Sequence, residues 1–109
     1  MIIVRIIMNA LPEKQKEVMQ TLVSMIGPTG KEKGCRSYQV FLDIEDKNVF
    51  SLIEEWETRD DLKNHIRSDR FGVLLGTKSL LSEPSKIRIY TVSHSEGAEV
   101  IHAAKDNKI

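Results

Sequence analysis

The stretch from residue 49 to residue 71 constrains this 109-residue chain most, because it joins an extended segment directly to a helical one. Its first half is rich in β-branched and aromatic residues, which favour a strand. Thr58 follows with the side chain of a helix N-cap, and the aspartates after it suit the positive end of a helix dipole. The stretch therefore predicts a strand that closes at Trp56 and a helix that begins directly after it.

The rest of the chain supplies further strands and one more helical region. We predict strands over 2–8, 35–44, 49–57 and 86–93, and helices over 13–26, 59–67 and 70–81, with Gly27-Pro28 ending the first helix and Ser68 dividing the second region. With right-handed crossovers, the order β-α-β-β-α-β predicts a ferredoxin-like α+β sandwich, an antiparallel sheet with helices on one face. We assign residues 1–97 to this domain and expect 98–109 to form an extension with a short strand and a flexible tail.

The second face of the predicted sheet has no helix to cover it. Successive side chains of a strand point to opposite faces, so this face carries one of two sets of residues. One set contains Tyr38, Leu52 and Trp56, and the other contains their neighbours along the strands. Both sets are partly apolar. Burying about 600 Å² of apolar surface per subunit would contribute roughly 15 kcal/mol before ordering costs. We therefore expect a homodimer that forms through the sheet faces.

Composition excludes several classes of partner. Sixteen basic and sixteen acidic residues cancel, so neither a nucleic acid nor a membrane is an expected partner. The apolar segment 1–10 is too short to span a membrane and contains Arg5. One cysteine, Cys35, cannot form an internal disulfide, which favours a cytoplasmic location. The three histidines lack the spacing of metal ligands, so we predict no metal site.

One run of residues resembles a known family. Residues 56–71 read W-E-x-x-x-x-L-x-x-H-x-x-S-x-x-F, a pattern similar to that of antibiotic biosynthesis monooxygenase (ABM) domains, and the resemblance covers about residues 2–95. It implies a dimeric α+β barrel. Members include cofactor-free quinone-forming monooxygenases, haem-degrading enzymes and a sugar-phosphate isomerase, so the resemblance leaves several reactions open.

The resemblance carries over residue by residue. Polyketide-oxidising members pair the strand-end tryptophan with an asparagine and a tyrosine, and this chain has Leu52 and Leu62 at those positions. The histidine of haem-degrading members corresponds to Leu75, so the resemblance implies no haem, and we expect no cofactor. His65 matches a histidine that is frequent in quinol-monooxygenase-like and isomerase-like members.

His65 is accordingly the candidate catalytic residue. Histidine side chains ionise near neutral pH, which suits a general base that removes a substrate proton. His65 also follows Leu62 by one helical turn, so it borders the predicted buried face of the helix. A histidine that is hydrogen-bonded at the edge of the core is the competing interpretation, and the sequence leaves both open.

Five further residues are candidates for substrate binding. Trp56, Phe71 and Tyr38 would form aromatic walls for a flat ligand, although large aromatic residues more often pack in cores and interfaces. Arg88, on the last strand, would meet a substrate oxygen, and Asn9, at the end of the first strand, would donate to an oxyanion. A solvated side chain and a turn residue are the respective alternatives.

Three functional hypotheses follow. The first is a cofactor-independent monooxygenase that oxidises a small quinol or polyphenol with O₂, using His65 as base in a dry aromatic pocket. The second is an isomerase of a small phosphorylated ketone, with Arg88 or Arg36 holding the phosphate. The third is a non-catalytic dimeric module that binds a small molecule or a partner protein, which Leu52 and Leu62 favour because they remove polar partners from the site.

Overall fold

The computed structural model describes residues 1–106 and has the predicted ferredoxin-like architecture. The elements are β1 (Ile2–Asn9), the 3₁₀ helix η1 (Pro12–Lys14), α1 (Gln15–Gly30), β2 (Cys35–Leu42), β3 (Val49–Trp56), α2 (Arg59–Ile66), α3 (Asp69–Gly76), the 3₁₀ helix η2 (Thr77–Leu80), β4 (Lys86–Thr91) and α4 (Ala98–Lys105). The strands form one antiparallel sheet in the order β2-β3-β1-β4. This order confirms the predicted fold class.

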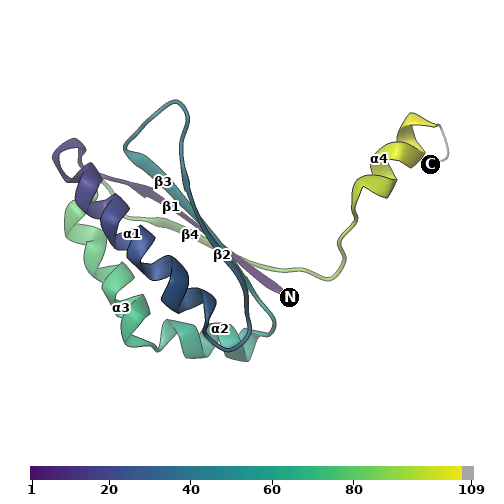
Figure 1. Ribbon diagram of the computed structural model, residues 1–109, viewed down its shortest axis with the longest axis horizontal. Coiled ribbons are helices and arrows are strands. Elements are labelled where there is room, and N and C mark those ends of the chain that lie inside the picture. The colour runs from purple at the N-terminus through teal and green to yellow at the C-terminus, as the bar shows by residue number, and fades with distance from the viewer. Residues whose placement is uncertain (107–109) are drawn as a thin grey trace.

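The first three α-helices cover one face of the sheet (Figure 1). Alternate residues of β1 and β3 are buried against them, namely Ile2, Val4, Ile6, Met8, Phe50, Leu52, Glu54 and Trp56. The residues between them are half-buried or exposed, with Arg5 the most exposed of β1. The structure thus answers the question that the sequence left open, because the set with Leu52 and Trp56 faces the helices.

Side-chain caps begin the two short helices as predicted. The Thr58 hydroxyl accepts a hydrogen bond from the Asp61 backbone N–H at the start of α2, and the Ser68 hydroxyl accepts one from the Phe71 N–H at the start of α3. The Ser68 hydroxyl also donates to the His65 carbonyl at 2.6 Å. Ser68 therefore ends one helix and begins the next.

The predicted end of the first helix at Gly27-Pro28 is wrong, because α1 continues to Gly30. Proline inside a helix removes one backbone hydrogen bond and crowds the carbonyl four residues before it, so other contacts must offset this cost. Thr29, the residue after it, is fully buried. Packing of this turn on the core thus carries the helix past the proline.

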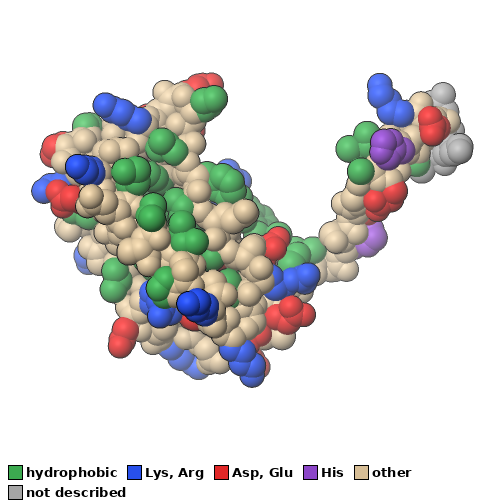
Figure 2. Space-filling model, in the orientation of Figure 1, with side chains coloured by type: hydrophobic (Ala, Val, Ile, Leu, Met, Phe, Trp, Pro, Cys, Tyr) green, Lys and Arg blue, Asp and Glu red, His purple; other side chains and the backbone are tan. Residues whose placement is uncertain are grey.

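The short strand expected near residue 99 is also wrong, because Ala98–Lys105 form the helix α4. The Glu99 carboxylate accepts a hydrogen bond from the Gly97 N–H at 2.8 Å, which organises the helix start. Figures 1 and 2 show this helix standing away from the sheet and the helical layer, so it meets no strand edge there. The predicted flexible tail lies partly at 107–109, outside the described residues. Within residues 1–106, no helix combines the length and the apolar character needed to cross a membrane.

Gly34 determines how the chain enters β2. Its φ is +80°, a left-handed conformation that L-residues adopt at a cost of roughly 1–2 kcal/mol. A Cβ at this position would overlap the Asp61 side chain of α2. The Gly34 carbonyl also accepts a hydrogen bond from the Glu57 N–H at 2.8 Å. The turn thus brings the start of β2 against the β3–α2 corner.

We expect Gly34→Ala to lower the free energy of unfolding by more than about 1 kcal/mol, because it adds backbone strain and a clash with Asp61. Urea denaturation measures this. Gly27→Ala is the matched control, since a Cβ there meets nothing within 4 Å and a helical alanine should stabilise by about 0.5–1 kcal/mol. Equal stabilities for the two variants would contradict this account of the turn.

Candidate functional site

His65 lies between two aromatic rings in the layer between sheet and helices. Its imidazole stacks on the Trp56 indole with ring centroids 4.6 Å apart, and the Phe71 ring meets it edge-on at 5.3 Å. Trp56 ends β3 on the buried face, while the caps of α2 and α3 turn His65 and Phe71 toward it. The structure therefore brings three of the candidate residues together, with His65 only 1% exposed.

A carboxylate and a guanidinium hold one side of the imidazole. The Glu32 oxygens, in the loop before β2, lie 3.0 and 3.1 Å from His65 Nδ1. Arg70 donates to the second Glu32 oxygen at 2.8 Å. The carboxylate acts as acceptor, so Nδ1 carries a hydrogen, and in the neutral imidazole Nε2 is then the nitrogen able to accept a proton. Arg70 is partly exposed, so the hydrogen bonds through Glu32 and Arg70 connect the buried imidazole to the surface.

Glu54 lies on the other side of the imidazole and is fully buried. Its Oε1 accepts a hydrogen bond from the Trp56 indole N–H at 2.9 Å and lies 3.6 Å from His65 Nε2. Burial raises the pKa of Glu54, and this effect exceeds the lowering by the Trp56 hydrogen bond and by His65. Glu54 is therefore a buried acid that retains its proton to higher pH than an ordinary carboxyl.

Polar atoms around Glu54 have unused hydrogen-bonding capacity. Within residues 1–106, Glu54 Oε2, His65 Nε2 and the Tyr38 hydroxyl have no hydrogen-bond partner. Tyr38 pairs with Glu54 across β2 and β3, and burial raises the pKa of its phenol well above the ordinary value. Buried unpaired polar atoms with shifted pKa values are uncommon in structural cores and are concentrated at functional sites. We call His65, Glu54, Trp56 and Tyr38 the polar cluster.

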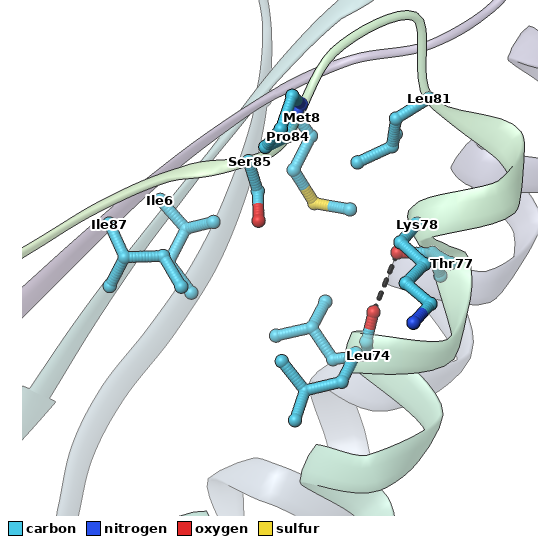
Figure 3. A pocket seen from close by; sticks show the side chains of 10 residues that line it. Ile6, Met8, Leu74, Thr77, Lys78, Leu81, Pro84, Ser85 and Ile87 are labelled. Atoms are coloured by element: carbon cyan, nitrogen blue, oxygen red, sulfur yellow. Dashed lines mark hydrogen bonds between the residues drawn. The ribbon is translucent and has the colours of Figure 1, made fainter.

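An apolar cavity of about 340 Å³ lies between the sheet and α3, next to η2. Figure 3 shows side chains of β1 and β4 on one side and of α3 and η2 on the other, including Ile6, Met8, Ile87, Leu74 and Leu81. His65 is not part of its wall. Leu74 lies one helical turn beyond Phe71, and Ile6 pairs with the residue two before Glu54. The cavity thus lies in the same layer as the polar cluster, between sheet and helices, and shares no lining residue with it.

Two candidate residues and one alternative lie away from the polar cluster. Arg88 pairs with Arg5 on the open face of the sheet, opposite the helices. Asn9 donates to the Glu83 carboxylate at 2.7 Å and joins the end of β1 to the loop before β4. Arg36 lies 3.7 Å from Glu57 at the surface. No arginine proposed for a phosphate is thus brought to His65.

Sequence reasoning missed Glu54, Glu32 and Arg70. The strand alternation placed Glu54 on the same face as Trp56, and a carboxylate within an apolar set was a signal that could have been used. Glu32 has no comparable signal, because it lies in a charged loop 33 residues before His65. Arg70 is one of several arginines in a charged segment, and only its contact with Glu32 distinguishes it.

Known proteins from several organisms are similar to this chain. The protein sll1783 of Synechocystis is 29% identical over 86 residues, which cover 78% of this chain and 58% of that protein. YcnE of Bacillus subtilis, named provisionally as a monooxygenase, is 28% identical over 85 residues, which cover 77% of this chain and 90% of YcnE. A conserved protein of Methanosarcina mazei has a solved structure that is 34% identical and superposes with a TM-score of 0.77, covering 82% of this chain and 89% of that one.

The sequence profile of the family described as "Antibiotic biosynthesis monooxygenase" matches residues 1–74. The matched range contains the strand, the caps and the histidine on which the predicted resemblance depended. This match covers more than half of the chain, and the solved structure of the Methanosarcina mazei protein covers 82% of it. The chain therefore belongs to the antibiotic biosynthesis monooxygenase family.

Proposed function

We propose that this protein is a cytoplasmic, cofactor-independent monooxygenase that oxidises a small quinol or polyphenol with O₂. The observation that carries the proposal is an apolar cavity of about 340 Å³ in the same layer between sheet and helices as a buried cluster of titratable side chains. This volume lies within the range of about 300–1,000 Å³ that is usual for small-molecule sites. Membership of a family that contains monooxygenases supports the proposal.

The electron balance of this reaction closes with the substrate alone. A quinol and O₂ give a hydroxyquinone and water, so one oxygen atom enters the ring and the other leaves as water. Oxidation of the quinol supplies two electrons and hydroxylation of the ring supplies two more, which together reduce O₂. The protein then has to remove a phenolic proton, exclude water and hold the ring, because the phenolate is electron-rich enough to react with O₂.

His65 Nε2 is the proton acceptor in this proposal. Its other nitrogen is held by Glu32, whose carboxylate would stabilise the positive charge of the imidazolium that forms. Glu32, which is partly exposed, accepts the proton from Nδ1 and passes it to solvent, while Arg70 holds the Glu32 carboxylate in place. Phe71 contacts the imidazole and Leu74 lines the cavity, so we expect substrate entry to move one of these two side chains.

A binding module without catalytic activity is the second candidate, and one observation favours it. The cavity wall does not include His65, whose imidazole is fully enclosed. The isomerase hypothesis has weaker support, because Arg88 lies on the opposite face of the sheet and Arg36 pairs with Glu57 at the surface.

We expect His65→Ala to reduce oxygen uptake with 1,4-dihydroxynaphthalene by about 100-fold, since a general base contributes roughly 10²–10⁴ in rate. An oxygen electrode measures uptake above the rate of spontaneous oxidation, and ¹⁸O₂ tests whether one labelled atom enters the product. His102→Ala, on the exposed helix α4, is the matched control. Full activity of His65→Ala would show that the assigned role is wrong. Ligand binding without oxygen uptake by the wild type would favour the binding module.

Stability should depend on pH through Glu54. Burial raises its pKa in the folded state, so its stabilising contribution is complete below the unfolded pKa of about 4.3 and is lost as pH rises through the native value. We therefore expect the stability of Glu54→Gln relative to the wild type to increase from about pH 4 to about pH 8. Urea denaturation at several pH values measures the difference. Glu55→Gln, on the open face, is the control, and a constant Glu54→Gln difference would contradict the buried-acid interpretation.

A homodimer through the open face of the sheet is part of this proposal. Phe41 and Tyr90 are 44% and 46% exposed on that face, next to half-buried isoleucines of β1 and β3. Apolar side chains on an uncovered sheet favour association, because burying them removes their surface from water.

We expect light scattering to give twice the 12.4 kDa mass of the chain, and Phe41→Glu to shift the protein toward the monomer by placing a charge in the interface. Val73→Glu is the matched control, because Val73 is 55% exposed but lies on α3, on the helical side. A monomeric wild type, or equal dissociation by both substitutions, would rule out this interface.

A further inference from the structure

We propose that the cavity beside η2 recognises an aromatic molecule that carries one negatively charged oxygen group, and that Lys78 binds this group. The inference rests on the proposed function, because it assumes that the cavity is the substrate site. It goes further by naming the ligand's charge and the residue that selects it. Lys78 is then a specificity-determining residue.

The polar groups of the cavity wall are few. Thr77, Lys78 and Ser85 are its polar residues, and no acidic residue lines it. The Thr77 hydroxyl is already used, because it donates to the Leu74 carbonyl at 2.6 Å, the dashed line in Figure 3. Neither the Lys78 ammonium nor the Ser85 hydroxyl makes a hydrogen bond or ion pair to another residue in the part of the chain that the structure describes. These two groups therefore remain available to a ligand.

Lys78 and Ser85 belong to opposite walls of the cavity. Figure 3 shows Lys78 on the helical wall beside Leu74, and Ser85 on the sheet side with its hydroxyl directed toward the interior. The remaining wall is apolar, with Ile6 and Ile87 on the sheet and Leu74 and Leu81 facing them. A ligand that fills the cavity would bury its hydrocarbon part among these side chains and place a polar group near the lysine.

The charge on Lys78 determines which polar group fits. Lys78 is an exposed residue, and its ammonium attracts an anion that lies against the apolar wall. An ammonium is a compact charge with three donors, and it hydrogen-bonds well to a carboxylate or phenolate oxygen. A cationic ligand would be repelled, and a neutral one would gain only the apolar contacts. The wall thus favours an aromatic carboxylate or phenolate.

This selectivity also fits the proposed reaction. A quinol that has lost one proton is a phenolate, and a nearby ammonium favours the charged form over the neutral form. Lys78 would then bind the reactive form of the substrate. The same contact serves a substrate with a ring carboxylate, so the class is defined by the anionic oxygen.

Two probes of nearly equal shape test the inference. We expect the protein to bind 2-naphthoate about 10-fold more tightly than the neutral 2-naphthamide in isothermal titration calorimetry, because a charge-assisted hydrogen bond adds to equal apolar burial. Lys78→Met should remove this difference and leave the affinity for 2-naphthamide unchanged. Lys63→Met, an exposed lysine of α2, should retain it. Ile87→Trp, which fills the cavity from β4, should weaken both ligands.

Three results would overturn the inference. The first is equal affinity of the wild type for both probes, and the second is absence of binding by either one. The third is an equal loss for both probes in Lys78→Met, which would show that the lysine contributes only packing. Neither probe is a quinol, so binding is measured without turnover. Preference for 2-naphthoate in a protein that consumes no oxygen would support the anion site and contradict the proposed monooxygenase.

Discussion

The stack of Trp56 on His65 joins the end of β3 to the end of α2, and the helical layer is arranged around it. The Trp56 indole also donates to Glu54, so one side chain orders both neighbours of the imidazole. On the other side, Ser68 donates to the His65 carbonyl and caps α3, which places Phe71 against the ring. The position of α2 is therefore decisive, because a rotation of this helix would separate His65 from Trp56 and Phe71.

The side chains around His65 differ in charge according to their depth in the protein. Arg70 is partly exposed and balances Glu32, which in turn hydrogen-bonds His65. Glu54, behind the imidazole, has a raised pKa because burial disfavours its charged form. A buried charge without a partner costs several kcal/mol, so protonation is the less costly state for the innermost carboxyl. The network thus has charged groups near solvent and, in the core, a carboxyl whose pKa is raised by burial.

The sheet separates two sets of residues that the sequence presents side by side. The face against the helices carries the core, the polar cluster and the cavity, whereas Arg5, Arg88 and Phe41 lie on the other face. Successive side chains of a strand point to opposite faces, so one strand supplies both surfaces. This separation is why Arg88 does not reach the histidine, and why chemistry and association can use different sides of the same sheet.

The sequence by itself determined the four strands, the order of the elements up to β4, the caps at Thr58 and Ser68, and the aromatic residues that meet at His65. Periodicity and capping depend on neighbouring residues, so these features are visible locally. Only the tertiary structure decided that Glu32 and Arg70 join His65 and that a cavity remains beside η2. Those features depend on which distant segments come into contact and on the space that packing leaves, and neither is encoded in a short stretch of sequence.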